Sequence, residues 1–410
     1  MKKWLGMAVL AATACGGTTD GGPSDDPVVI VTGNAQNNGV AQSDDGTSQN
    51  PTSQNNGVVA ENNGVVSGTG LALLGSGQHT LDSVELAIIA SSADNLRTPR
   101  DLAFHPSRPT ELWIVNLDDN STVVIDNPGT DSQRSHRYGA AGKDHFMARP
   151  SALAFGDNGN FATAHETDDV TQPSTPIDFM GPTLWSSDRT IFDGGHGGHL
   201  DMLHNSPNGA GIAWETGNKY WIFDGYHQAI TAYDFNRDHG PGGTDHTDGD
   251  VARYVEREVG YVPEVPSHLE FHHGLNLLFV ADTGNNRIAT LDPTVGEMGP
   301  RLEPNYDGGA QYHMNGGAIE TFAEGSAVGL EKPSGLAIQG EHVYVGDNAL
   351  SKIVALDFDG TLVDYLDLSS EIPAGGLMGI AFATDGTLFV VDAVENEILR
   401  VAPLEGGGTP

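Results

Sequence analysis

The feature that most constrains the fold of this 410-residue chain is a motif that recurs six times after residue 98. Each copy opens with a short segment such as 150–155 or 333–338 and continues into a second apolar run that ends in an acidic or amide residue. Both runs are rich in β-branched and aromatic residues and are separated by Asp, Asn and Gly, which is typical of strands joined by tight turns. The copies begin at Pro99, Pro150, Pro207, Pro266, Pro333 and Gly376.

No segment between these runs has the length and periodicity of an amphipathic helix, so an alternating β–α–β fold is disfavoured. Repeats of this size that each hold about four short strands predict an all-β chain folded as a six-bladed β-propeller. Successive repeat-initial prolines lie 51, 57, 59 and 67 residues apart, which is longer than a minimal blade requires. We therefore expect insertions at 167–205, 236–265 and 293–332.

Two short sequences add a family resemblance to this pattern. Pro-Ser-Gly-Leu-Ala at 333–337 and Val-Ala-Asp-Thr-Gly-Asn-Asn-Arg-Ile at 280–288 resemble NHL repeats. The resemblance extends over about 81–403 and is most specific in the last three copies. It implies a propeller whose first strands line a central channel and whose chain ends share one blade, so we expect 81–89 to complete the last blade.

An acidic or amide residue ends the second run of every copy. Because the feature recurs six times, we interpret it as structural, with the side chain accepting hydrogen bonds from backbone amides of the following turn. Departures from the repeat are more informative, such as His268 at a position where other copies carry Gly, Ala or Asp. The recurring residues are Asn116, Glu166, Asp224, Asp282, Asp347 and Asp392.

The first 15 residues have the features of a processing segment. Two lysines precede an apolar run, 4–12, that is too short to span a bilayer stably. Ala-Thr-Ala-Cys at 12–15 resembles a bacterial lipobox, which implies a lipidated Cys15, a membrane attached through the lipid, and a location in the bacterial cell envelope, at the outer membrane or the periplasmic face. An ordinary signal peptide with a chance cysteine is the alternative. We expect 16–75, rich in Gly, Asn, Ser and Thr, to be a flexible low-complexity linker and 76–405 to form the propeller.

The charge balance limits the classes of partner and cofactor. With 55 acidic and 19 basic residues, the chain has a formal net charge of −36. Such a field repels nucleic acid and attracts divalent cations. The sequence also has no phosphate-binding loop and no haem motif, so we expect neither a nucleotide nor a haem cofactor. Cys15 is the only cysteine, and it excludes an intramolecular disulfide.

Nine of the 16 histidines fall between residues 196 and 273. His196, His199, Asp201 and His204 form one candidate metal site, because imidazole and carboxylate donors suit zinc or a similar ion. The alternative is a polar loop of hydrogen-bonded histidines. A second candidate has alternating carboxylates around a glycine, which suit calcium, although a solvated acidic loop has the same composition. Its members are Asp245, Asp248 and Asp250.

Asp-Gly-Tyr at 224–226 resembles a turn of the peptidylglycine amidating lyase propeller. The resemblance implies Tyr226 as a general base beside a zinc ion, with packing or surface binding as the alternative role for this tyrosine. The positions at which that family carries its zinc histidines hold Asn208, Ser267 and Met378 in this chain.

Three functions follow as hypotheses. In the first, a divalent metal shapes a recognition face for a protein, peptide or glycan. In the second, the chain is a metal-dependent lyase or hydrolase with Tyr226 as acid/base and ligands drawn from His199, His204, His227 and His268. In the third, the chain is purely structural. Convergence of the ligands over a pocket would favour the enzyme, and scattered or closed ligand sets would favour binding.

Overall fold

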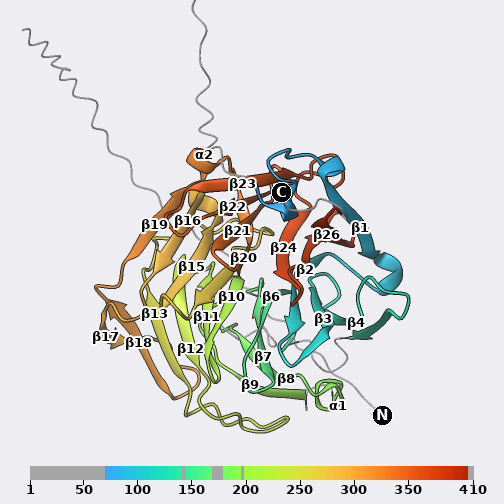
Figure 1. The fold of residues 1–410 in the computed structure, drawn as a ribbon. Helices are drawn as coiled ribbons and strands as arrows, with labels where there is room; N and C mark the ends of the chain where they lie inside the picture. The colour runs from blue at the N-terminus through green and yellow to red at the C-terminus, as the bar shows by residue number, and fades with distance from the viewer. Residues whose placement is uncertain (1–69, 140–144, 169–178, 195–197, 405–410) are drawn as a thin grey trace, which may run out of the picture. The chain divides into compact units, whose positions relative to one another are not determined.

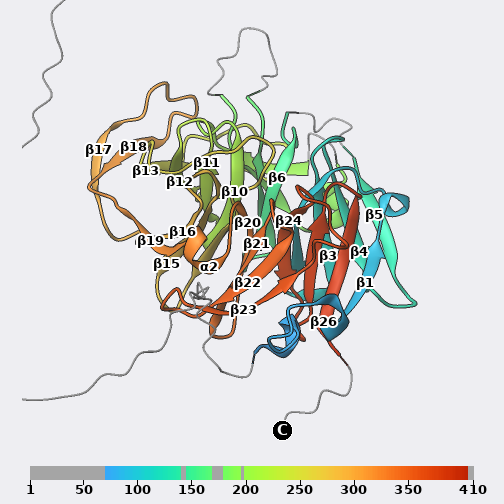
Figure 2. The same cartoon turned by 90° about the horizontal axis from the view of Figure 1, so that it is seen from above.

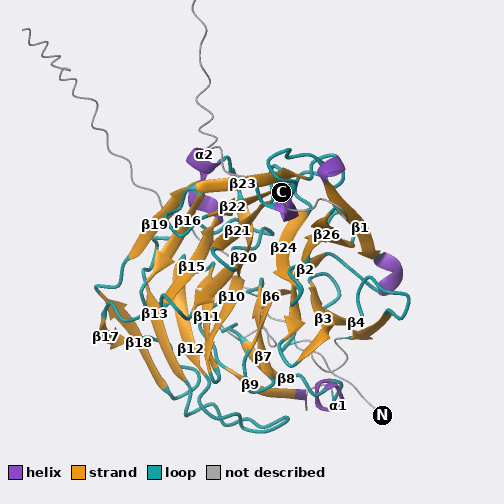
Figure 3. Cartoon of the chain, viewed as in Figure 1, coloured by secondary structure: helices purple, strands orange, loops and turns teal. Residues whose placement is uncertain are grey.

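A computed structural model describes residues 70–139, 145–168, 179–194 and 198–404. Clustering of contacts divides the chain into Met1–Asn62 and Asn63–Pro410, and every described residue belongs to the second unit. This unit is built almost entirely of strands (Figure 3), and the α-helices among its described residues are single turns, α1 (Arg189–Phe192) and α2 (Gly325–Val328). None of the helices in this part of the chain is long and apolar enough to cross a membrane.

The strands form six antiparallel blades, and the predicted six-bladed propeller is confirmed. Blade 1 comprises β2 (Pro99–His105), β3 (Arg108–Asn116), β4 (Ser121–Asp126) and β5 (Arg134–Tyr138). Blade 2 comprises β6 (Pro150–Phe155), β7 (Asn160–His165), β8 (Thr183–Ser186) and β9 (His199–Met202). Blade 3 comprises β10 (Gly209–Thr216), β11 (Lys219–Asp224), β12 (Ala229–Asp234) and β13 (Asp250–Tyr254).

The remaining blades follow the same order from the axis to the rim. Blade 4 comprises β14 (Leu269–His272), β15 (Leu277–Asp282), β16 (Arg287–Leu291) and β19 (Ile319–Glu324). Blade 5 comprises β20 (Pro333–Gln339), β21 (His342–Asp347), β22 (Lys352–Leu356) and β23 (Leu362–Asp367). Blade 6 comprises β24 (Leu377–Phe382), β25 (Leu388–Asp392), β26 (Glu397–Pro403) and β1 (Val84–Ala90).

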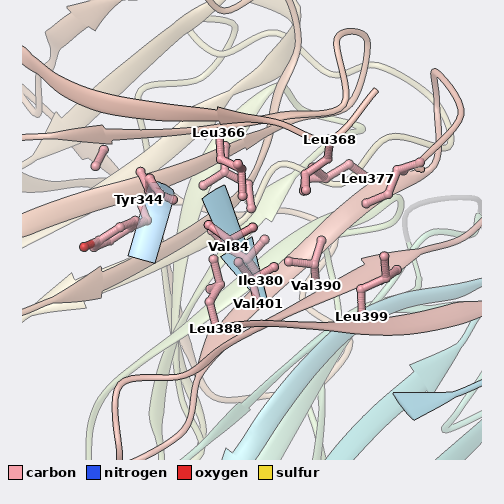
Figure 4. Packing of buried hydrophobic residues seen from close by; sticks show 14 of the residues in the cluster. Val84, Tyr344, Leu366, Leu368, Leu377, Ile380, Leu388, Val390, Leu399 and Val401 are labelled. Atoms are coloured by element: carbon pink, nitrogen blue, oxygen red, sulfur yellow. The ribbon is translucent and has the colours of Figure 1, made fainter. Parts of the chain in front are cut away.

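The two ends of the folded unit meet in blade 6. Strand β1 pairs antiparallel with β26, from Val84 opposite Pro403 to Ala90 opposite Ile398, as expected from segment 81–89. Val84 also lies in a buried cluster with Leu399 of β26 and Leu366 of blade 5 (Figure 4). The blade that closes the ring is thus held by strand pairing and by a shared apolar core.

The first strands stand at the centre of the ring (Figure 1) and each contacts the first strands of the two neighbouring blades. The fourth strands lie at the rim. Each pair of neighbouring blades shares apolar side chains, so the core consists of clusters between blades and not of one central mass.

One insertion leaves its own blade. Within 293–332, β17 (Glu297–Arg301) and β18 (Ala310–Asn315) extend blade 3, because β18 pairs in parallel with its outer strand β13. Figure 2 shows both strands at the rim, beyond β13. The chain then returns as β19 to complete blade 4. The loop between β17 and β18 is thereby brought next to blade 2.

Three of the six recurring residues hold the following turn as predicted, and Asp224 is one of them, because it accepts from the amide of His227. Asp392 accepts hydrogen bonds from the amides of Val394 and Glu395, and Asp347 accepts one from Leu350. The other three accept from amides elsewhere in the chain, which are those of Arg97 for Asn116, Glu264 for Glu166 and Gly260 for Asp282.

At the start of the folded unit, the expected linker boundary at residue 75 is corrected. Leu74 is fully buried in the cluster of blades 5 and 6, so the packed part of the chain begins before residue 76. Residues 1–69, with the expected signal peptide and Cys15, lie outside the described residues.

Candidate functional site

The predicted insertion after β12 folds onto the neighbouring blade. Its segment 235–249 runs along β9, the outer strand of blade 2, whose edge offers unpaired backbone groups. The amide of His239 donates to the carbonyl of Leu200 at 3.1 Å, and that of Gly242 donates to the carbonyl of His199 at 2.9 Å. Two histidines of the segment are thereby placed over the middle of β9.

These two histidines meet Asp201 of β9. His246 Nδ1 lies 2.6 Å from Asp201 Oδ1, and His239 Nε2 lies 3.9 Å from the same oxygen. One potential ligand atom of each residue lies within 4.8 Å of the other two. In the described part of the chain, these three residues form the group of His and Asp side chains that could hold a metal ion. We call Asp201, His239 and His246 the rim triad. Two nitrogens and an oxygen at this spacing can hold a zinc-like ion.

The rim triad has buried polar atoms without partners. His239 Nδ1 lies 2.7 Å from the carbonyl oxygen of Gly240, which can only accept, so Nδ1 carries the proton and Nε2 has a free lone pair. His239 Nε2 and Asp201 Oδ2 are both buried and lack a hydrogen-bond partner among the described residues. Such atoms are costly unless a ligand satisfies them. A metal-bound histidine is also usually oriented in this way, by a hydrogen bond from its other ring nitrogen to a carbonyl oxygen.

Electrostatics at the rim triad favour positive charge. Asp201 is fully buried. Burial opposes the charged form of His246, but the hydrogen bond to Asp201 and the charges of Asp201, Asp307 and Asp245 outweigh it and raise the pKa of His246. The site thus combines a buried carboxylate with nearby acidic groups, as a cation site requires.

The other predicted histidines lie around the rim triad with partners of their own. His204 Nδ1 contacts Asp307, whose Oδ2 also accepts from the His204 amide at 3.1 Å. The His204 ring centre is 6.2 Å from that of His246, and the His199 ring centre is 5.1 Å from that of His239. His199 stacks on Phe146, and His196 lies outside the described residues.

The predicted calcium ligands do not come together as one group. Asp245 accepts from the amide and hydroxyl of Thr247, and Asp248 lies 3.6 Å from Arg237. Asp250 contacts the Asn236 side chain. Each carboxylate serves its own turn at the surface, as in the solvated alternative.

Tyr226, His227 and His268 lie away from the rim triad. Tyr226 and His227 precede β12 and the triad histidines follow it, so a six-residue strand of about 20 Å separates them. Tyr226 is exposed, and His227 Nδ1 lies 2.9 Å from Asp224. His268 lines the central cavity, so the structure does not bring it together with the rim histidines as ligands of one site. The histidine-rich insertion packs at the rim because it follows the third strand of its blade.

The axis itself holds a cavity of about 430 Å³ lined by all six first strands. Asp101 of blade 1 faces His268 of blade 4 there, with 3.7 Å between Asp101 Oδ1 and His268 Nδ1. At the end where the first strands begin, segment 255–266 crosses between blades. The Arg100 guanidinium donates to the Glu264 carbonyl, and Glu166 accepts from the Tyr261 hydroxyl at 2.9 Å.

Of the residues predicted from the sequence, Asp201 lies in the rim triad and His199 and His204 lie beside it, whereas His239, His246 and Asp307 were not predicted. The two missed histidines flank the glycine-rich turn 240–243, and His246 lies inside the predicted acidic loop. Their position seven residues apart beside carboxylates was the available signal. No sequence signal indicated Asp307, because its contact with His204 depends on an insertion of blade 4 that pairs with blade 3.

Comparison with known proteins adds the fold alone. No protein-family profile matches the sequence, and neither does any curated protein. Among solved structures, an auxiliary nutrient binding protein from Bacteroides ovatus is 13% identical, with a TM-score of 0.51 over 78% of this chain and 77% of its own. A protein of unknown function from Bacteroides thetaiotaomicron is 12% identical, with a TM-score of 0.53 over 78% and 76%. Virginiamycin B lyase from Staphylococcus aureus is 13% identical, with a TM-score of 0.46 over 78% and 100%. The chain is similar to these proteins as a β-propeller.

Proposed function

We propose that this chain is a ligand-binding propeller of the bacterial cell envelope in which a divalent metal ion, bound by the rim triad, holds segment 235–249 on blade 2. The observation that carries the proposal is the pair of buried, unpartnered ligand atoms, His239 Nε2 and Asp201 Oδ2. Because two of the three donors are imidazoles, the ion is of the zinc type, and calcium, which prefers oxygen ligands, is disfavoured.

The metal has a structural role in this proposal. It joins a long insertion of blade 3 to the edge of blade 2, where Asp307, from the loop between β17 and β18, also contacts His204. The surface made by these insertions is the recognition face for a protein, peptide or glycan. Tyr226 lies at the opposite end of blade 3, so the geometry favours binding over a metal-dependent lyase or hydrolase.

One further observation agrees with binding. The Bacteroides ovatus propeller is described as an auxiliary nutrient binding protein, which makes ligand capture a function that this fold performs elsewhere. We also propose, from the lipobox-like sequence that ends in Cys15, that this residue is lipidated and anchors the chain to the envelope membrane. The linker that follows Cys15 would then join the anchor to the NHL-like propeller. A mature N-terminal peptide without a lipid on Cys15 would contradict the anchor.

The metal content of the purified protein tests the rim triad. Protein prepared without chelator and dialysed against zinc should contain about one zinc per chain by elemental analysis. Asp201→Asn and His239→Ala should each reduce the content to well below half, because each removes a ligand. A free ligand concentration of 100 times the dissociation constant stabilises a folded protein by about 2.7 kcal/mol. Zinc should therefore raise the melting temperature of the unmodified chain.

His136→Ala is the matched control, because His136 is an exposed histidine of blade 1 that pairs with Asp126. It should bind as much zinc as the unmodified chain. Equal zinc in all three variants would show that the metal binds elsewhere, and no zinc in any of them would end the proposal. Metal-free protein that keeps its circular dichroism spectrum would show that loss of zinc is not loss of fold.

A further inference from the structure

The axial cavity has acidic side chains and lacks basic ones. Asp101, Asp157 and Glu270 line it, and no Lys or Arg stands among its lining residues, all of which lie in the described part of the chain. Asp101 of blade 1 and Glu270 of blade 4 come from opposite sides of the ring, and both line this cavity. Its volume of about 430 Å³ falls in the range of small-molecule sites.

The Glu270 carboxyl lacks a partner. No described residue donates a hydrogen bond to it, and Glu270 is half-buried in the wall of the cavity. Burial, together with the nearby Asp101 carboxylate, raises the pKa of Glu270 to about 7. A cation placed beside this group would favour its ionised form. A cationic ligand can therefore supply the hydrogen-bond donor and the positive charge that the described residues do not give to Glu270.

Asp101 and His268 add polar capacity next to Glu270. Asp101 accepts from the amides of Leu102 and Leu153, at 2.8 and 3.0 Å. The His268 side chain is 5% exposed, and its Nε2 is buried without a partner among the described residues. Buried polar atoms of this kind point to a missing ligand or solvent molecule.

Aromatic side chains form the wall of the cavity. Each ring comes from a first strand or the turn after it, and together they contribute from five of the six blades. Ring faces attract cations and also bury apolar surface. The aromatic lining residues are Phe104, Phe155, Trp214, Phe271 and Phe382.

We propose that the axial cavity binds a small organic amine in its protonated form, with the ammonium group between the carboxyls of Glu270 and Asp101 and the carbon body against the aromatic wall. A carboxylate or phosphate ligand would meet two acidic groups and no basic side chain. A bare metal ion is disfavoured, because Asp101, His268 and Glu270 do not form a ligand group of the kind that the rim triad forms. N–H donors are needed to satisfy Glu270, which favours a primary amine over a quaternary ammonium.

This site does not depend on the rim triad, and its test separates the two. Calorimetric titration of the full chain with benzylamine at pH 7.5, both with and without a chelator, should show one site. Benzyl alcohol and benzoate, which keep the ring and replace the ammonium by a neutral or anionic group, should bind at least tenfold more weakly. Equal binding of benzyl alcohol would show that the cavity binds the ring alone and does not recognise the ammonium group, which would contradict the proposal. Failure of benzylamine to bind would overturn it.

Glu270→Gln should weaken benzylamine binding at least tenfold, because it removes the charge and keeps the shape. Glu297→Gln, at an exposed carboxylate of β17, is the matched control and should bind as the unmodified chain does. Since Glu270→Gln also removes an unpartnered, half-buried carboxyl, its melting temperature at pH 7.5 should not fall. Unchanged affinity in this variant would contradict the assignment. Loss of amine binding on chelation alone would show that the cavity is not independent of the metal.

Discussion

The carboxyl of Glu270 couples the stability of the propeller to pH. Its pKa is about 7 in the folded chain, against an ordinary value of 4.5, because burial disfavours the charged form. Between these values the folded chain binds more protons than the unfolded chain, so the free energy of unfolding falls as the pH rises from about 4.5 to about 7. The contribution of this one group to the fall is on the order of 3 kcal/mol.

Urea unfolding of the unmodified chain and of Glu270→Gln at pH values from 5 to 8 measures this coupling. The variant should become more stable relative to the unmodified chain as the pH rises, and the difference should level off above pH 8. Taking the difference removes the other titrating groups, which both proteins share. Two curves that stay parallel over the whole range would mean that Glu270 ionises normally.

Single residues also show where sequence reasoning stops. Asp201 was predicted as a ligand because it stands between histidines in one short segment. His239 and His246 lie 38 and 45 residues further on, in another blade. Their contact with Asp201 depends on two backbone hydrogen bonds between segment 235–249 and β9, which no local pattern encodes.

Segment 235–249 is the element whose order depends on metal in this account. Its Arg237 side chain is 90% exposed and offers a bond to trypsin, but cleavage requires the surrounding residues to leave β9. Chelated protein should be cut after Arg237 at least several-fold faster than zinc-loaded protein. Mass spectrometry of the fragments identifies this bond among other exposed sites.

Asp201→Asn provides the control for that experiment, since it keeps the size of the side chain and removes its charge. The variant should be cut after Arg237 at the same rate with zinc and with chelator. If zinc does not slow cleavage of the unmodified chain, the metal does not hold the segment. If zinc protects the variant equally, the ion acts at another place.

Strands were easier to predict than insertions. The motif starting at Pro150 or Pro333 specifies two strands and a turn through residues that are adjacent in sequence, and the strand near 81–89 closes blade 6 as expected. The insertion at 293–332 was predicted by its length. The pairing of this insertion with blade 3 was not predicted. The contact between β18 and β13 joins residues about 60 positions apart and requires a free strand edge.

Across the whole molecule, the ring separates two kinds of site. First strands place Asp101, His268 and Glu270 at the axis, where a repeat-based argument can locate them. Insertions that follow third strands reach the rim, where the rim triad joins blades 2 and 3. The net charge of −36 favours cations at both sites, a divalent metal at the rim and a protonated amine at the axis.

The central claim is that a metal ion joins two blades at the rim. Anomalous diffraction from crystals of zinc-loaded protein, recorded on both sides of the zinc absorption edge, tests it most directly. We predict one strong peak per chain within bonding distance, about 2.0–2.2 Å, of Asp201, His239 and His246. A zinc-loaded crystal without a peak at these residues, or with its peak elsewhere, would contradict the account.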